Sequence, residues 1–259
     1  MPDSKAPFDA FQPYYELMVD WEHRLAFEAP FFQRVFSSAK ARRVLDCACG
    51  TGHHALLFAR WGLEAVGSDA SEAMVEEARR LAAAEHAPVR FQQADFRQLA
   101  DQFAEPFDAL LCTGNSLPLT DSREGLRQAV QNMHAVLAPG GVAVIHSLNY
   151  ACLPDGEIVY EDPRVRLVED REILFLKVAR RSRQHCDLNM VVLEKQAGEW
   201  KKMETRARAW ALEQPELRDV ATEAGFVRLQ WYGGYDPKPF DPATSRDLIL
   251  VARRRKSGA

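Results

Sequence analysis

The sequence predicts an α/β fold, in which a doubly wound, mostly parallel sheet of seven strands carries an antiparallel β insertion. Short apolar segments alternate with segments of helical periodicity between residues 43 and 146. A stretch at about 151–212 is typical of strands alone, and one helix and two strands follow it. Such alternation indicates right-handed βαβ crossovers, which place helices on both faces of a parallel sheet.

The N-terminal segment of about 8–40 is predicted to be helical, because its aromatic and aliphatic residues recur at helical spacing. Ser71 is placed to cap a later helix, and Pro139-Gly140-Gly141 is expected to stop the one after it. The first five strands are expected at 43–47, 65–69, 89–92, 109–112 and 142–146, with helices at 54–61, 71–84 and 122–137.

Beyond Tyr150 the alternation stops, and consecutive strands indicate an antiparallel meander packed on one end of the sheet. We therefore expect a single domain over 1–259, in which 8–40 forms a helical lid and 151–212 lies over the active site. The meander strands are expected at 166–168, 173–178, 188–194 and 205–212, followed by a helix at 215–224 and strands at 226–232 and 247–252.

Composition excludes several classes of protein. Among 259 residues, 33 basic and 37 acidic side chains give a net charge of −4, which argues against a nucleic-acid partner. No apolar run approaches the roughly 18–20 residues that span a bilayer, and the N-terminus lacks the pattern of a signal peptide. Five scattered cysteines are typical of reduced thiols. We therefore expect a cytoplasmic protein without a membrane or nucleic-acid partner.

The most informative segment runs from Val44 to Gly52. Asp46 ends a predicted strand, and Gly50 and Gly52 allow the backbone to turn tightly and approach a ligand. Ligands of open α/β sheets bind outside the carboxyl ends of the strands, where this Rossmann-like loop is expected. Gly50, Gly52 and Ala55 also match a G-x-G-x-x-[GA] dinucleotide fingerprint, so a nicotinamide-dependent dehydrogenase remains open.

Asp46, Asp69 and Asp95 each follow a strand that is expected to end at the same edge of the sheet. A single acid at such a place is usually a helix cap or a turn residue, whereas three together favour a cofactor site. No metal site is predicted, because Cys47 and Cys49 lack a second pair of ligands.

These motifs resemble those of the class I S-adenosylmethionine-dependent methyltransferases, over roughly residues 10–255. The family's first motif has an acidic residue, two further residues and then small-Gly-x-Gly, as in Asp46–Gly52. Residues 65–74 are similar to the second motif, 93–96 to the third and 107–116 to the fourth.

The resemblance implies S-adenosylmethionine as the cofactor and a small-molecule acceptor as the partner. Asp69 would bind both ribose hydroxyls, since a carboxylate can accept from two donors at once. Asp95 would accept from the adenine amino group, and Met74 would pack against the ring. The cofactor residues that the resemblance implies are Tyr14, Arg24, Asp46, Ala48, Gly50, Gly52, Asp69, Ala70, Met74, Asp95, Phe96 and Thr113.

Within this family the chain is most similar to the glycine N-methyltransferase-like branch, through residues 112–116, Asn149-Tyr150 and the aromatic N-terminal helix. In that branch an Arg 22 residues before the first-motif Asp binds the cofactor's carboxylate, and Arg24 stands 22 residues before Asp46. The alternative is a surface arginine on an amphipathic helix. Leu148 replaces the Arg that holds the carboxylate of glycine, which argues against glycine as the acceptor.

The acceptor is expected to be an amine, while O- and S-transfer stay open. Because a sulfonium methyl is already activated, the protein mainly has to position the acceptor and exclude water. No residue is therefore assigned a catalytic role. A nicotinamide-dependent dehydrogenase and a non-catalytic cofactor-binding module remain alternatives. The expected acceptor residues are Asn115, Tyr150, Tyr160, Arg206, Arg208 and Tyr235.

Overall fold

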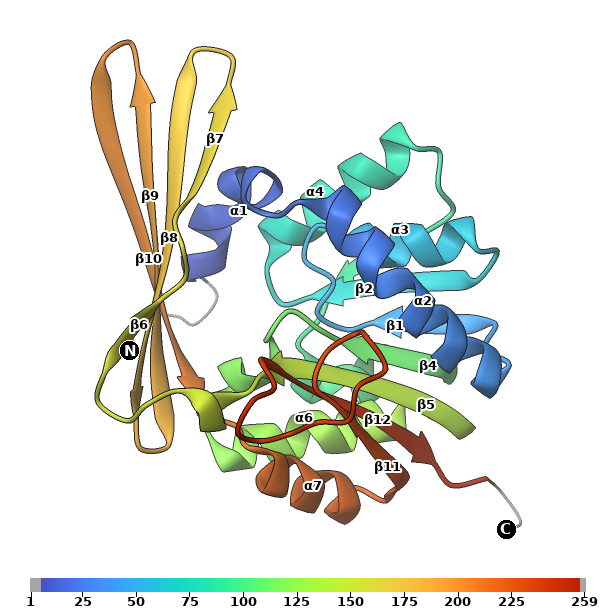
Figure 1. The fold of residues 1–259 in the computed structure, drawn as a ribbon. Helices are drawn as coiled ribbons and strands as arrows, with labels where there is room; N and C mark the ends of the chain where they lie inside the picture. Colours follow the sequence, from blue (N-terminus) through green and yellow to red (C-terminus); the bar gives the residue numbers. More distant parts are fainter. Residues whose placement is uncertain (1–5, 257–259) are drawn as a thin grey trace.

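The central sheet has the strand order β11-β12-β5-β4-β1-β2-β3 in a computed structural model that describes residues 6–256 (Figure 1). Strands β1 to β5 run parallel, whereas β12 is antiparallel to both of its neighbours. The predicted seven-stranded, mostly parallel sheet is therefore confirmed. Its strands are β1 (Arg43–Asp46), β2 (Glu64–Asp69), β3 (Arg90–Gln93), β4 (Phe107–Cys112), β5 (Leu137–Leu148), β11 (Phe226–Tyr232) and β12 (Asp247–Arg254).

Helices cover both faces of this sheet, as the alternation predicts. Buried residues of α2, α3 and α4 pack on one face, and those of α6 and α7 pack on the other. None of the helices described between residues 6 and 256 is long and apolar enough to cross a membrane. The helices are α1 (Ala6–Met18), α2 (Trp21–Ala39), α3 (His53–Arg60), α4 (Glu72–Ala84), α5 (Leu99–Gln102), α6 (Arg123–Ala135) and α7 (Gln214–Glu223), with short 3-10 turns η1 (Phe96–Gln98), η2 (Leu117–Thr120) and η3 (Tyr150–Cys152).

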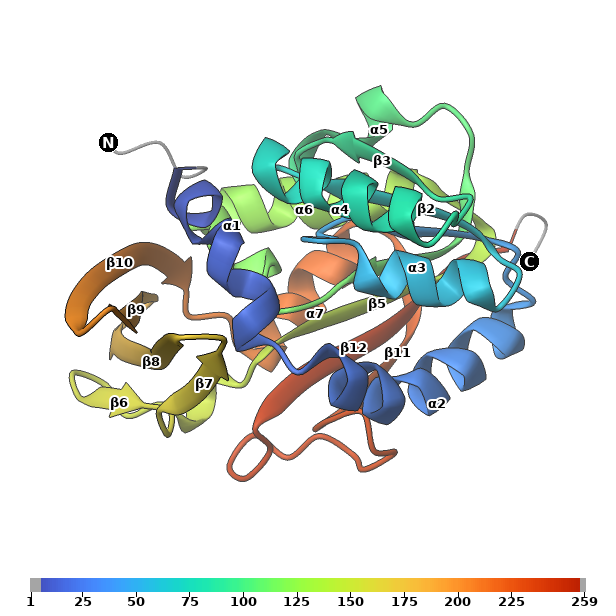
Figure 2. The ribbon, with the colours of Figure 1, turned by 90° about the horizontal axis from the view of Figure 1, so that it is seen from above.

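The strands between β5 and α7 in the chain form a second sheet, which is antiparallel. Helix α1 lies between this sheet and the central, mostly parallel sheet (Figure 2). One face of this sheet places Ile173, Phe175 and Val192 against Phe11 and Met18 of α1, and all five side chains are buried. We call this side the inner face. The strands are β6 (Ile158–Tyr160), β7 (Arg164–Val168), β8 (Arg171–Ser182), β9 (His185–Gln196) and β10 (Glu199–Trp210).

Two details of the sequence-based prediction were wrong. Strand β6 was not predicted, because three residues carry too little pattern to identify a strand. Residues 139–141 do not stop a helix: α6 ends at Ala135, and these residues belong to β5. The backbone there requires glycine, because a Cβ at Gly141 would lie 2.8 Å from the Ala138 carbonyl oxygen. The Pro-Gly-Gly segment therefore coincides with a register irregularity between β4 and β5.

Candidate active site

The loop after β1 is held by the acid that ends β2. Gly50 and Gly52 have φ values of +52° and +88°, which side chains with a Cβ rarely adopt. The Gly50 backbone N–H donates to Oδ2 of Asp69 at 2.9 Å, and the Ser71 N–H donates to Oδ1 at 3.0 Å. Ser71 in turn accepts from the Met74 N–H and caps α4, as predicted. Asp69 therefore joins the glycine loop to the start of α4.

Asp46 is a buried carboxylate at the end of β1, with an exposed fraction of 1%. Neither of its oxygen atoms has a hydrogen-bond partner among residues 6–256. Burial raises the pKa of Asp46 to about 6, and nearby Asp69 raises it as well, while His54, the Ala48 backbone and Arg24 lower it. A buried, ionised carboxylate without a hydrogen-bond donor carries a desolvation cost, which a bound cation would offset.

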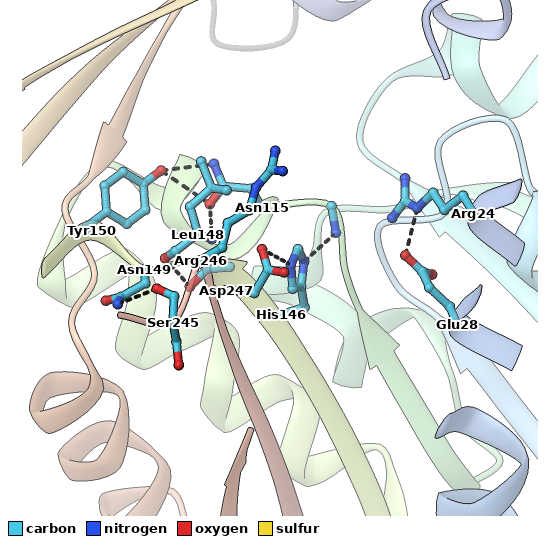
Figure 3. A network of polar contacts seen from close by, with 12 residues as sticks. Arg24, Glu28, Asn115, His146, Leu148, Asn149, Tyr150, Ser245, Arg246 and Asp247 are labelled. Carbon is cyan, nitrogen blue, oxygen red and sulfur yellow. Dashed lines mark hydrogen bonds and ion pairs between the residues drawn. The ribbon is translucent and has the colours of Figure 1, made fainter. Parts of the chain in front are cut away.

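Arg24 lies close to Asp46 and is held by a buried acid of its own helix, α2. Its Nε donates to Oε1 of Glu28 at 2.9 Å, and its guanidinium lies 5.0 Å from the ring centre of Trp21 (Figure 3). The other carboxylate oxygen of Glu28 lies 2.6 Å from Nε2 of His54 in α3. Burial alone would raise the pKa of Glu28, but hydrogen bonds and charges from His54 and Arg24 lower it overall. Glu28 is therefore an ionised anchor for Arg24.

His146, at the end of β5, connects the β4 loop to β12. Its Nδ1 accepts from the Gly114 N–H at 3.2 Å, and its Nε2 lies 3.3 Å from Oδ1 of Asp247 (Figure 3). An acceptor at Nδ1 requires the proton to be on Nε2, where it can be donated to Asp247. Both ring nitrogens are thus engaged within the protein.

Tyr235 reaches the same region from the loop between β11 and β12. Its ring centre lies 5.6 Å from that of His146 and about as close to Phe31 and Phe32 of α2. The hydroxyl group is buried and has no hydrogen-bond partner. Burial raises the pKa of Tyr235 well above its usual value, so the group stays a neutral phenol. The structure therefore brings Tyr235, Arg24 and Asp46 to one region.

Asn115 and Tyr150 form an internal hydrogen-bonded pair. Asn115 has a φ of +65° and donates from Nδ2 to the Tyr150 hydroxyl at 2.9 Å, while its Oδ1 accepts from the Leu148 N–H at 3.0 Å (Figure 3). Tyr150 is fully buried, and this burial raises the pKa of its hydroxyl above the usual value. The two residues predicted for the acceptor thus join the β4 loop to the end of β5.

The third acid, Asp95, follows β3 and begins the turn η1. Its Oδ1 accepts from the Arg97 N–H, and its carboxylate also pairs with the Arg97 guanidinium. Met74 is buried beside this edge, and Phe96 is half-buried against the core. The remaining predicted cofactor residues occupy the loops after β1, β2 and β4: Ala48, Ala70 and Thr113.

The structure does not bring Tyr14 to the glycine loop. Its hydroxyl donates to Oε2 of Glu194 in β9 at 2.7 Å. The neighbouring Tyr15 faces the loop instead, since a Cβ at Gly50 would lie 3.5 Å from its ring. Sequence reasoning missed Tyr15, because two adjacent tyrosines can be told apart only when the direction of each helix face is known.

Three predicted acceptor residues lie away from this site, on the outer face of the antiparallel sheet. Tyr160 is 68% exposed, and Arg206 and Arg208 pair with the surface acids Glu204 and Asp187. The prediction chose these residues by chemical type alone, whereas successive side chains of a strand point to opposite faces. We therefore do not assign these three residues to the acceptor.

The sequence of this chain is similar to those of known methyltransferases. Residues 44–141 match the family described as "Methyltransferase domain". The chain is 34% identical over 146 residues to "Glycine/sarcosine N-methyltransferase" of Parasynechococcus marenigrum (strain WH8102), which covers 56% of this chain and 52% of the relative. The chain spans about half the length of the first curated relatives that it matches.

Solved structures show the same fold over nearly the whole chain. The sugar N-methyltransferase KedS8 from Streptoalloteichus sp ATCC 53650 matches with a TM-score of 0.75 and 24% identity, covering 96% of this chain and 93% of that one. CalS10 with bound SAM, an amino pentose methyltransferase from Micromonospora echinaspora, matches with a TM-score of 0.75 and 23% identity, covering 93% and 94%.

Proposed function

We propose that this chain is a class I S-adenosylmethionine-dependent methyltransferase and that it transfers the methyl group of this cofactor to a small-molecule amine. One observation carries the proposal: the half-buried guanidinium of Arg24 and the buried carboxylate of Asp46, which has no hydrogen-bond partner among residues 6–256, lie together at the carboxyl ends of the parallel strands. The methionine part of S-adenosylmethionine carries a carboxylate and an ammonium group, which are the complementary charges.

The residues present fit this cofactor. Arg24 would bind the carboxylate. Its contact with Glu28 uses Nε, so the two terminal nitrogens of the guanidinium are the groups that would donate to the cofactor. A guanidinium can offer a carboxylate two parallel hydrogen bonds. Asp46 would accept from the ammonium group, which supplies the partner that its two oxygens lack. A nicotinamide dinucleotide has neither group. The presence of both Arg24 and Asp46 at this site therefore favours the methyltransferase over a dehydrogenase.

The adenosine part would lie along the edge formed by β2 and β3. We assign the ribose hydroxyls to Asp69 and the adenine amino group to Asp95, with Met74 beside the ring. Both carboxylates already accept hydrogen bonds from backbone N–H groups, Asp69 from Gly50 and Ser71 and Asp95 from Arg97. These contacts fix the direction of each carboxylate, and a carboxylate has room for more than one donor.

The bound cofactor supplies a methyl group on a positively charged sulfur, and this chain's own residues position the acceptor. His146 holds the β4 loop and β12 rather than removing a proton, since both of its nitrogens are engaged. A neutral amine needs no base to attack an activated methyl group. The buried Tyr235 phenol would donate to or accept from the acceptor, because its hydroxyl has no hydrogen-bond partner in the part of the chain that the structure describes.

An amine acceptor fits the names of similar proteins, which are a glycine/sarcosine N-methyltransferase, an amino pentose methyltransferase and a sugar N-methyltransferase. Glycine itself is disfavoured by Leu148. We place the enzyme in the cytoplasm, acting on small molecules rather than on nucleic acid; its five free thiols and net charge of −4 support this assignment. Helices α1 and α2 act as a lid on a single domain. The α1 part of this lid packs against the antiparallel sheet.

The test is turnover with S-adenosylmethionine and a panel of primary and secondary amines, followed by mass spectrometry. The expected product is an amine heavier by one methyl group, formed in equal amount with S-adenosylhomocysteine. Methylation of an alcohol or thiol alone would overturn the amine assignment. Binding of S-adenosylhomocysteine without turnover of any acceptor would favour the non-catalytic module.

A further inference from the structure

Three cations share one carboxylate at the rim of the site, and we call Arg164, Lys177, Arg246 and Glu161 the rim cluster. The Arg246 guanidinium lies 3.4 Å from Glu161, the Lys177 ammonium 3.8 Å and the Arg164 guanidinium 3.9 Å. These separations allow only loose pairing, since good charge-assisted hydrogen bonds are about 2.7–2.9 Å. The cluster therefore holds more positive than negative charge.

Lys177 faces the interior. It lies on β8 at the same alternation as Ile173 and Phe175, which are buried against α1, so its side chain is on the inner face. Its side chain is only 36% exposed. Arg164 shares this face, because it pairs with Phe175 across β7 and β8 and donates to the Met18 carbonyl. A small hollow between α1 and β8 is lined by Met18, Glu161, Asp162, Arg164, Phe175 and Lys177.

The rim cluster lies within electrostatic range of the proposed cofactor residues. Burial lowers the pKa of Lys177, and the charges of Arg164, Arg24 and Arg246 lower it further, against the opposite effect of Glu161. Arg24 is the residue that we assign to the cofactor. Lys177 of the cluster and Arg24 therefore lie in one region, near enough for their charges to interact.

Arg246 connects the cluster to the acceptor side of that region. Its carbonyl accepts from the Asn149 N–H, and the next residue, Asp247, pairs with His146. Figure 3 shows Arg246 beside Asn115, with its guanidinium directed away from the strand ends. A molecule whose amine lies near Tyr235 and His146 could extend another group toward this guanidinium.

We propose that the rim cluster binds an anionic group, a carboxylate or a phosphate, at the end of the acceptor remote from its amine. The inference rests on the proposed methyltransferase function and names its substrate class as anionic amines. Asp162 lines the same hollow, so the three cations exceed the two nearby acids by one charge, which an added anion would balance.

The test uses matched pairs of acceptors that differ only in the anionic group: an amino acid and its amide, and an amino-sugar phosphate and the free amino sugar. Lys177→Met and Arg246→Met remove one charge each and keep much of the apolar stem. Arg206→Met removes a charge from the outer face of the same sheet and is the matched control. Formation of S-adenosylhomocysteine is measured as kcat and KM, with the Tm of each variant as the check on folding.

We expect the anionic member of a pair to be preferred at least tenfold in kcat/KM, and the preferred pair distinguishes carboxylate from phosphate. Lys177→Met and Arg246→Met should raise the KM for that member about tenfold, with little change in kcat. The KM for the neutral member and the affinity for S-adenosylhomocysteine should also change little. Equal use of both members of each pair, or equal KM values in the rim and control variants, would overturn the inference.

A binding measurement covers the case in which no pair is turned over. With S-adenosylhomocysteine present, pyrophosphate or malonate should bind the wild-type protein in calorimetry and bind Lys177→Met at least tenfold more weakly. Absence of binding by both anions would overturn the anion site while leaving the methyltransferase intact. Failure of S-adenosylhomocysteine itself to bind would instead contradict the proposed function.

Discussion

Oε2 of Glu28 lies 2.6 Å from Nε2 of His54, and this buried contact joins helix α2 to helix α3. The same carboxylate anchors Arg24 through its other oxygen. Removing one partner from such a buried group leaves the others unsatisfied, which typically costs several kcal/mol. The Arg24 guanidinium is thus positioned by a residue that does not itself touch the cofactor.

Glu28→Gln should therefore weaken binding of S-adenosylhomocysteine by about tenfold, or ~1.4 kcal/mol. Affinity for 5′-methylthioadenosine, which lacks the methionine carboxylate, should change little, because Glu28 acts through Arg24. Calorimetry with both ligands measures the difference. Glu22→Gln changes an exposed acid of the same helix and is the control. Equal losses for both ligands would show that Glu28 supports the fold and not the position of Arg24.

Arg24→Lys tests the proposed carboxylate contact itself. An ammonium group cannot reproduce the two parallel hydrogen bonds of a guanidinium, so affinity for S-adenosylhomocysteine should fall about tenfold, or ~1.4 kcal/mol. Adenine and ribose contacts are common to both ligands, so the affinity for 5′-methylthioadenosine isolates the carboxylate. If both affinities fall together, Arg24 has no specific contact with this group.

Asp46→Asn should stabilise the ligand-free protein at neutral pH. The native pKa of about 6 lies above the unfolded value near 3.9, so the native state binds more protons between these values. The contribution of Asp46 to stability is thus complete below pH 4 and is lost as the pH rises through 6. At ~1.4 kcal/mol per pKa unit, the variant removes a cost of about 1–3 kcal/mol. Its Tm advantage should appear at pH 7.5 and disappear near pH 4; no advantage at pH 7.5 would contradict this account.

The same substitution should weaken cofactor binding, because a neutral amide cannot pair with an ammonium group as a carboxylate does. The wild-type protein should lose affinity for S-adenosylhomocysteine as the pH falls below about 6, where Asp46 becomes protonated. Titrations between pH 5 and 8 measure this loss. A pH-independent affinity in this range, or an unchanged affinity in Asp46→Asn, would show that Asp46 does not bind the ammonium group.

The parallel sheet was predictable from sequence because its strands are short apolar runs separated by amphipathic helices. The Asp46–Gly52 loop and the Ser71 cap were predictable because each depends on residues close together in the chain. The face of the antiparallel sheet was not, since many residues of β8 and β9 are half-buried and give no clear alternation. Arg206 and Arg208 were misplaced although exposed and more buried residues alternate along β10, because they were chosen for their charge and not for their place in that alternation.

Contacts between distant segments also lay outside the reach of sequence patterns. Glu28 and His54 look like ordinary residues of two amphipathic helices, and only the packing of α2 on α3 joins them. Likewise, Glu161, Lys177 and Arg246 come from three separate segments, and no local spacing predicts their approach.

The central claim is that the carboxyl ends of the parallel strands bind S-adenosylmethionine, and equilibrium titration with S-adenosylhomocysteine and with NADH tests it most directly. We predict saturable binding of S-adenosylhomocysteine, with a rise in Tm of several degrees when the ligand is at about 100 times its Kd. NADH should produce neither heat of binding nor a Tm shift. Binding of NADH, or no binding of S-adenosylhomocysteine at millimolar concentration, would contradict the claim.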